Sequence, residues 1–322
     1  MHPAPSIIAF TTLSGLGFGL LAWTGLLEAA GALPLDLLFG VATIVFALGC
    51  ATSGLLASML HLGRPERAWR AFSQWRSSWL SREGVAALAT YVPALLFAGL
   101  WLSGATGIAW AVCGLLAAVG SIATVISTAM IYRSLKPIRQ WHNHWVVPNY
   151  LLLAAMTGAF WLTAALGVFD VIRPVVAALT AALVLVAAGG KILYWRFIDR
   201  TSAASSLSSA TGLPSGRVIR PLDPPHTQEN YLLREMGYRI ARRNAGMLRG
   251  VAVAAGFAAP LILLGFAWTF RNGSASALLA TAAALLSTAG VLVERWLFFA
   301  EATHTVMLYY RGAPDQTEPR HQ

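Results

Sequence analysis

Charge is scarce in this sequence. Only 11% of its 322 residues are Asp, Glu, Lys or Arg, while 57% are hydrophobic and the mean hydropathy is +0.63. Because soluble domains carry about 25% charged residues, this composition excludes an ordinary soluble enzyme and indicates an integral membrane protein. The opening MHPAPSIIAF contains neither Lys or Arg nor a cleavage site of small residues, so we expect a first span there and not a signal peptide.

Motifs that hold cofactors are missing too. The two cysteines, Cys50 and Cys113, lie in separate apolar runs and form no CxxC pair, so we expect neither structural zinc nor an iron–sulfur cluster in this chain. The apolar runs contain no His near mid-membrane, where a haem would need its axial ligands. A glycine-rich nucleotide loop and a nucleophile elbow are also absent. We therefore expect no metal site in the chain.

Long apolar runs dominate what remains. Each is long enough to cross about 30 Å of hydrocarbon, and the backbone can pair its own polar groups there by forming a helix. The sequence therefore predicts an all-α integral membrane protein, a bundle of eight transmembrane helices in one membrane domain over residues 1–322. The predicted spans are residues 5–30, 36–60, 84–103, 106–132, 146–167, 172–195, 248–270 and 275–300.

The basic residues gather on one side of this predicted bundle. An even number of spans places both termini on the same side, together with the loops 61–83, 133–145 and 197–247, which are rich in Arg. The only basic residues in the loops of the opposite side are Arg173 and Arg271. Because positive loops stay in the cytoplasm, we expect both termini and the three basic loops on the cytoplasmic face of a bacterial inner membrane.

The segment 64–81 predicts an amphipathic helix at the membrane surface. At helical spacing its apolar face would hold Trp69, Phe72, Trp75 and Trp79, opposite Arg67, Arg70 and Gln74. Two interpretations stay open, a simple surface connector between two spans and a roof over a binding pocket.

The loop 197–247 divides into two parts. A Ser-rich flexible linker comes first, and a helix over about residues 231–244, capped by Thr227 or Asn230, is predicted to follow. So long a polar loop favours a docking surface for a soluble partner. The alternative is a solvated loop with a basic face.

His61 and Glu83 are the first candidate site. His61 ends the second predicted span and Glu83 begins the third, so both lie at the cytoplasmic face, between Arg64 and Arg82. A His and a carboxylate there could bind and protonate a ligand at the membrane surface. Helix dipoles and an N-cap at Ser81 would also account for both residues, so the pattern alone leaves the two interpretations open.

The last predicted helix carries the second set of candidates, Glu294, Arg295, Glu301 and His304. Spacing places Glu301 and His304 on one face, and Glu294 on the same face two turns earlier. These residues could be ion pairs that fix helix packing, or a polar wall or proton route to a buried pocket. Lys191 lies near a helix end, where we expect its side chain to reach the membrane surface.

Three segments resemble the membrane-anchor subunits of DMSO reductase-type molybdenum oxidoreductases. They are HPAPSIIAFTTLSGLGFGLLAWTGL at 2–26, SMLHLGRPERAWRAFSQWRSSWLSREGV at 58–85 and GVLVERWLFFAEATHTVMLYYRG at 290–312. The resemblance covers essentially the whole chain, and 58–85 is its specific part. It implies eight spans, no haem, iron–sulfur cluster or molybdenum in the anchor itself, a quinone site in the anchor, and two soluble partners. One partner would carry four iron–sulfur clusters and the other a molybdenum bis-pterin guanine dinucleotide.

The same resemblance implies roles for individual residues. His61 and Glu83 match positions implicated in quinol binding, and we group Ser81, Arg64 and Arg82 with them as the expected quinone site. The cytoplasmic basic loops and the long loop 197–247 resemble the anchor of the cytoplasmic, quinone-dependent sulfite dehydrogenase, which passes electrons from sulfite to ubiquinone or menaquinone. The alternatives are the anchor of a DMSO or related reductase that oxidises quinol, and a membrane transporter.

Overall fold

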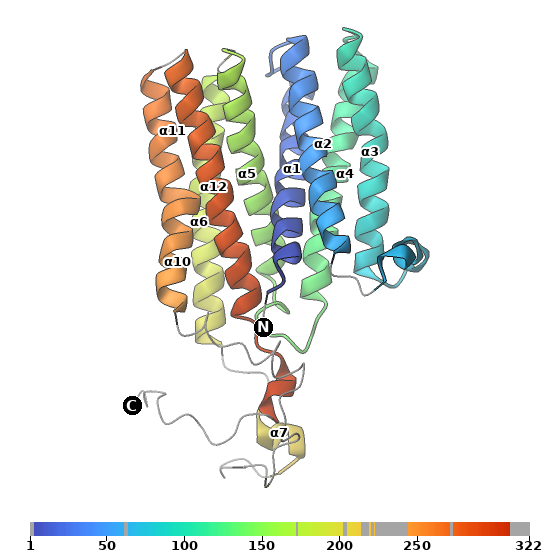
Figure 1. Cartoon of the computed structure of the whole chain (residues 1–322), viewed down its shortest axis with the longest axis vertical. Coiled ribbons are helices and arrows are strands. Elements are labelled where there is room, and N and C mark those ends of the chain that lie inside the picture. The colour runs from blue at the N-terminus through green and yellow to red at the C-terminus, as the bar shows by residue number, and fades with distance from the viewer. Residues whose placement is uncertain are drawn as a thin grey trace.

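The structure is a computed structural model that describes residues 3–60, 64–171, 173–201, 205–213, 219, 222, 244–270 and 273–309. Within these ranges the chain is all-helical and contains no β-strand. Eight helices there are long and apolar enough to cross a membrane, which confirms the predicted bundle. They stand side by side, and the start of α1 lies at the same end of the bundle as the end of α12 (Figure 1).

The spanning helices begin and end close to the predicted limits. The third starts five residues earlier than predicted and the sixth runs five residues further, because each continues into the polar residues of a basic loop. The spans are α1 (Pro5–Ala29), α2 (Leu37–Met59), α3 (Trp79–Leu102), α4 (Ile108–Arg133), α5 (Val146–Val168), α6 (Pro174–Arg200), α10 (Ala245–Val253) with η2 (Ala254–Ala258) and α11 (Ala259–Thr269), and α12 (Ser274–Ala300).

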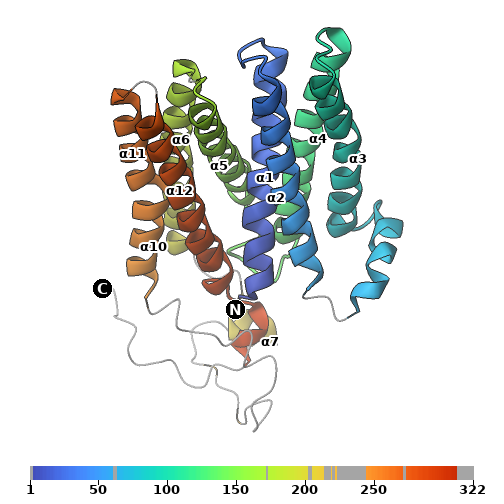
Figure 2. The same ribbon diagram turned by 45° about the horizontal axis from the view of Figure 1, so that its top comes forward.

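The helices pack in two halves that repeat one arrangement. In the first half α1 packs on α2 and α4, and α3 packs on α4; in the second, α5 packs on α6 and α12, and α11 packs on α12. Helices α1 and α5 meet at the centre, where α12 and α4 also contact them (Figure 2). Four crossings separate α1 from α5, so the two helices run in the same direction and the halves form a parallel repeat.

Small residues bring the central helices close together. At the crossing of α1 and α5, a Cβ on Gly19 would overlap the carbonyl of Ala154, and a Cβ on Gly158 would overlap the backbone of Gly19. Gly25 approaches Gly114 of α4 in the same way. Close backbone approach through Gly is a common way for helices to associate where the surrounding lipid offers no hydrophobic driving force.

The seventh span contains a π-helical turn, η2, at Ala254–Ala258. A π-turn widens the helix and leaves a carbonyl without its usual partner. The hydroxyl of Ser287 in α12 donates to the carbonyl of Gly256 at 3.1 Å. Gly290 lies directly against the backbone of the same turn, so α12 packs tightly on it.

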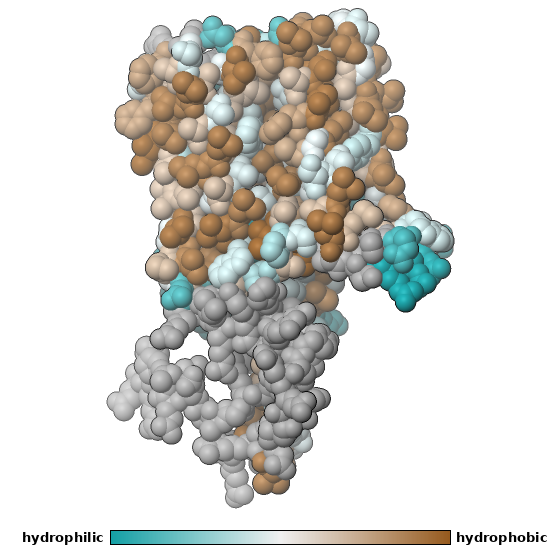
Figure 3. All heavy atoms as spheres, viewed as in Figure 1, coloured by the Kyte–Doolittle hydropathy of each residue, from teal (hydrophilic) through white to brown (hydrophobic). Residues whose placement is uncertain are grey.

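Apolar side chains cover the bundle, and the strongest polar patch in the view of Figure 3 lies over η1 (Pro65–Gln74). This segment is a 3-10 helix, where the sequence predicted an α-helix over 64–81. Ser78 is extended and separates it from α3, so Trp79 belongs to the spanning helix. Trp69 and Trp75 are 66% and 51% exposed, while the ring of Phe72 packs over Gly84 of α3.

Most of the loop 197–247 lies outside the described residues, including the helix predicted over 231–244. Its described part contains a short helix, α7 (Leu207–Thr211), which Ser206 caps and Gly212 ends in a left-handed conformation. After α12 the chain forms one 3-10 turn, η3 (Thr305–Leu308).

Candidate functional site

Glu83 lies inside the bundle, although the sequence placed it at the cytoplasmic face. It is the fifth residue of α3, its side chain is 3% exposed, and the hydroxyl of Thr128 in α4 donates to its Oε1. Small residues allow the two helices to approach this closely: Gly120 of α4 packs against the side chain of Thr90, two turns along α3 from Glu83.

The hydroxyl of Thr128 has two neighbours that can accept its proton. Besides Glu83, the carbonyl of Thr124 lies 3.1 Å from Oγ1. A hydroxyl carries one proton and can donate to only one acceptor at a time. Thr128 can therefore serve Glu83 as a donor when the carboxyl is ionised and as an acceptor when it is protonated.

A small cavity lies on the other side of Thr128, between α1, α4, α5 and α12. Its free space is of the order of one or two water molecules, too little for a quinone ring. Several hydroxyls of its wall bond to their own helices. Three polar atoms of the wall lack a regular partner among the described residues: Thr12 Oγ1 has none, and Tyr150 Oη and Arg295 Nη2 have none besides each other.

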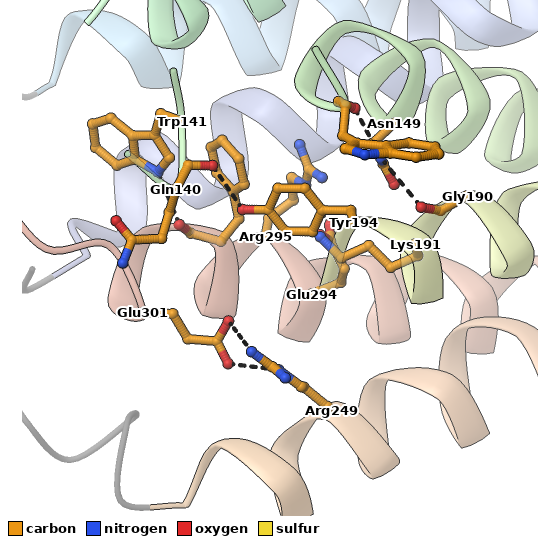
Figure 4. A network of polar contacts seen from close by, with 12 residues as sticks. Gln140, Trp141, Asn149, Gly190, Lys191, Tyr194, Arg249, Glu294, Arg295 and Glu301 are labelled. Carbon is orange, nitrogen blue, oxygen red and sulfur yellow. Dashed lines mark hydrogen bonds and ion pairs between the residues drawn. The ribbon is translucent and has the colours of Figure 1, made fainter. Parts of the chain in front are cut away.

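Arg295 joins this cavity to a buried ion cluster, which we define as Lys191, Glu294 and Arg295 (Figure 4). All three side chains are at most 3% exposed, and Glu294 pairs with both cations. The cations also face aromatic rings: Lys191 Nζ is 4.1 Å from the ring centre of Tyr194, and the guanidinium carbon of Arg295 is 4.3 Å from that of Tyr150. Ion pairing and ring faces together offset the cost of burying these charges.

A second ion network joins three helix ends near the start of the seventh span. Arg249 of α10 bonds to Glu301 at 2.9 Å and to Asp199 of α6 at 2.6 Å. Glu301 is 7% exposed and Asp199 54%, so the network runs from the protein interior to its surface. Figure 4 shows the pair of Arg249 and Glu301. Burial raises the pKa of the Glu301 carboxyl, and its bonds to Arg249 act in the opposite direction.

Comparison with known proteins identifies the family. A model of the DMSO reductase anchor subunit family (DmsC) matches residues 1–300. The chain is also 36% identical, over 97% of its length and 99% of the relative's, to a subunit of the sulfite dehydrogenase of Allochromatium vinosum. The chain belongs to the DMSO reductase anchor subunit family. It is therefore a membrane anchor subunit of a DMSO reductase-type oxidoreductase complex, as the resemblance implied.

The expected quinone-site residues of this anchor are only partly assembled in the structure. His61 lies outside the described residues. Arg64 is exposed at the start of η1, and Arg82 turns away from Glu83, donating to the carbonyls of Trp75 and Arg76. Arg82 therefore holds the turn that connects η1 to α3.

The expectation that Ser81 caps this helix of the anchor was wrong. The N-cap is Ser78, and α3 begins at Trp79. Ser81 is buried within the first turn, two residues before Glu83. Because residues two apart on a helix do not face each other, Ser81 is a buried helix residue and not a cap.

Two expectations about the later charges were also wrong. Lys191 is 1% exposed and does not reach the surface, because Glu294 holds it in the interior. Helix α12 ends at Ala300, so His304 shares no helix face with Glu301. The ring Nδ1 of His304 instead accepts from the backbone N–H of Val306 and caps η3, and the residue forms an isolated bridge with Ile138.

Sequence reasoning missed Thr128, Tyr150 and Arg249 as members of the anchor's polar interior. Thr128 and Tyr150 carry no signal in an apolar run, where Thr and Tyr have many structural uses. Arg249 lies where the seventh span begins, and its pairing with the end of α12 follows only from the packing of the helices.

Proposed function

We propose that this anchor is the quinone-reactive subunit of a three-subunit molybdenum and iron–sulfur oxidoreductase that passes electrons from sulfite oxidation to the quinone pool. The observation that carries the proposal is Glu83, a carboxyl buried within the bundle that accepts a hydrogen bond from Thr128. The name of the Allochromatium relative supports sulfite as the substrate of the complex.

The residues fit a quinone, which when bound would accept two electrons and two protons. In the proposal Glu83 exchanges a proton with the ligand oxygen, and Thr128 forms a hydrogen bond with the carboxyl in both protonation states. His61 donates a hydrogen bond to the ligand and is oriented by the carboxylate. Ser81 adds a buried hydroxyl to the first turn of α3, and Arg64 and Arg82 make the entrance positive. The internal cavity is too small for the ring, so the ligand would approach Glu83 from the η1 side.

The soluble partners would dock on the cytoplasmic face. The basic loops 61–83, 133–145 and 197–247 would receive an iron–sulfur protein, which accepts electrons from a molybdenum-containing catalytic partner. The positive-inside rule supports this placement in a bacterial inner membrane, with both termini cytoplasmic. Because protons would be taken up and released on the same side, we expect no net charge movement across the membrane.

A second candidate is a DMSO or related reductase, which the name of the matching family favours. The same residues would then work in reverse, with Glu83 taking a proton from quinol. The direction of electron flow depends on the catalytic partner, and identification of the co-purifying molybdenum protein and its substrate distinguishes the two.

The test is Glu83→Gln in the assembled complex, with His61→Ala in parallel. We expect quinone-linked turnover to fall about 100-fold or more, because a positioned acid–base group contributes about 10²- to 10⁴-fold, while dye-linked turnover by the soluble subunits persists. Glu66→Gln, on exposed η1, is the matched control and should leave both rates unchanged. Unchanged quinone-linked turnover in Glu83→Gln would show that the quinone site lies elsewhere.

A further inference from the structure

The cavity between α1, α4, α5 and α12 is a polar site apart from the expected quinone position. Thr12 lies on its α1 wall, Thr128 on α4, Tyr150 on α5 and Arg295 on α12. Each of these side chains is at least nine-tenths buried. Four helices of both halves therefore each place a polar group around one small space.

The unpartnered atoms of this wall indicate what occupies it. Thr12 Oγ1 lacks a hydrogen bond to the described residues, and Tyr150 Oη and Arg295 Nη2 have no partner there besides each other. Buried polar groups in folded proteins are bonded either to protein or to ordered water. The space suits one or two water molecules, and a water needs two to four polar partners, which this wall provides.

The two sides of the cavity differ in charge. The cluster of Lys191, Glu294 and Arg295 contains two cations and one anion, an excess of one positive charge beside the cavity. Glu83 lies across the cavity behind Thr128, and its carboxylate would balance that excess. Water between Thr128 and Arg295 would connect the two charged sides through a chain of oriented hydrogen bonds.

Thr128 can form a hydrogen bond with Glu83 in both protonation states of the carboxyl. When Glu83 is ionised, Thr128 donates to it and accepts from a cavity water. When Glu83 is protonated, its carboxyl O–H donates to Thr128, whose own proton turns to the carbonyl of Thr124. When Glu83 gives its proton to the quinone, Thr128 turns back to the carboxylate, and the only proton that changes atoms is the one passed from Glu83 to the ligand.

We propose that this cavity is a water-binding site, and that its water, held by Arg295 and Thr12, positions Thr128 to support both protonation states of Glu83. The inference rests on the proposed function, in which Glu83 exchanges a proton with the ligand. Thr128 and Arg295 act through Glu83 and are positioning residues.

The test compares Thr128→Val, Thr128→Ser and Thr12→Val in the intact complex. Quinone-linked turnover should fall about tenfold in Thr128→Val and recover in Thr128→Ser, with dye-linked turnover unchanged. Thr12→Val removes a water ligand without touching Glu83, and should lower turnover about threefold. Thr24→Val is the matched control, because Thr24 is a buried α1 residue that bonds to its own helix outside the cavity, and it should behave as wild type.

Infrared difference spectroscopy supplies a readout that a purely structural role would not change. The carboxyl band that disappears in Glu83→Gln should shift in frequency in both Thr128→Val and Thr12→Val, and a water band sensitive to H₂¹⁸O should be lost in Thr12→Val. If Glu83→Gln abolishes quinone-linked turnover but the Thr variants match wild type in rate and in both bands, the water site is refuted while the proposed function stands. If Glu83→Gln itself keeps full turnover, the proposed function fails instead.

Discussion

Glu294 is the residue on which the buried charges depend. It pairs with Lys191 and with Arg295, and none of the three side chains is more than 3% exposed. An ionised side chain without a partner is expensive in the interior of a membrane protein. Loss of Glu294 would therefore leave both cations without an anion, whereas loss of either cation would leave Glu294 paired with the other.

This asymmetry predicts unequal effects of two substitutions. Glu294→Gln leaves two buried cations without an anion and should destabilise the anchor by about 3–5 kcal/mol. Lys191→Met leaves the balanced pair of Glu294 and Arg295 and should cost clearly less. Thermal unfolding of the purified complex in lipid nanodiscs measures both. Leu193→Met, at an exposed position of α6, the helix of Lys191, is the control and should be near neutral.

Equal losses of stability in the two variants would contradict this interpretation of the cluster. They would mean that Lys191 holds α6 against α12 by packing on the ring of Phe298, and not mainly through its charge.

At the scale of the helices, position is set mostly by small residues and helix ends. Gly19 and Gly158 let α1 and α5 cross with their backbones in contact, and that crossing fixes the wall of the polar cavity. Arg249 ties the start of α10 to the ends of α6 and α12. Both features join segments that are far apart in the sequence.

The crossing of α1 and α5 gives the second prediction. In Gly19→Ala the new Cβ would overlap the carbonyl of Ala154, so the helices must separate, and we expect loss of folded anchor and of quinone-linked turnover. Gly49→Ala on α2 is the matched control, because nothing lies within 4 Å of its added Cβ. There Ala should be neutral or stabilising by up to about 1 kcal/mol, since it favours the helix more than Gly does. Yields and melting temperatures in nanodiscs are the measurements, and a Gly19→Ala variant that behaves as wild type would show that the helices have room to adjust.

At the scale of the molecule, the parallel repeat places unlike chemistry at equivalent positions. Thr128 and Arg295 each lie five residues before the ends of α4 and α12, at Arg133 and Ala300. Glu83 and Arg249 are each the fifth residue of their helices, α3 and α10. Where the first half carries a carboxyl and its hydroxyl partner, the second half therefore carries two arginines, which pair with carboxylates of their own half.

Sidedness is the third prediction and concerns the whole chain. In a background without Cys50 and Cys113, Ala105→Cys lies in the exposed loop between α3 and α4, and Lys136→Cys in the basic loop between α4 and α5. The positive-inside rule predicts that a membrane-impermeant maleimide labels position 105 in intact cells and position 136 only after permeabilisation. The reverse pattern would place the basic loops, and with them the proposed docking face, outside the cytoplasm.

The eight spans could be predicted closely because their signal is local. A run of apolar residues of sufficient length must form a helix in lipid, wherever its neighbours lie. The ends were less certain: α3 begins at Trp79 because Ser78 is extended, a turn that the apolar pattern does not reveal. For the same reason Ser81 was mistaken for a cap.

Charged residues could be selected from the sequence, but not their partners. Glu83, Glu294, Arg295 and Glu301 all stand out among apolar neighbours, yet Lys191 was expected at the surface because its distance from a helix end gave no sign of Glu294. His304 was placed on α12 because periodicity continued past Ala300, where the helix ends.

The sequence by itself determined that this chain is a membrane protein of eight spans and which of its residues carry charge, because hydrophobicity and length act locally along the chain. Only the tertiary structure decided that Glu83 bonds to Thr128, which also lines a polar cavity, and that Lys191 and Arg295 share one carboxylate. Those contacts depend on how helices cross, and the central crossing is set by Gly19 and Gly158, whose partners lie more than a hundred positions away.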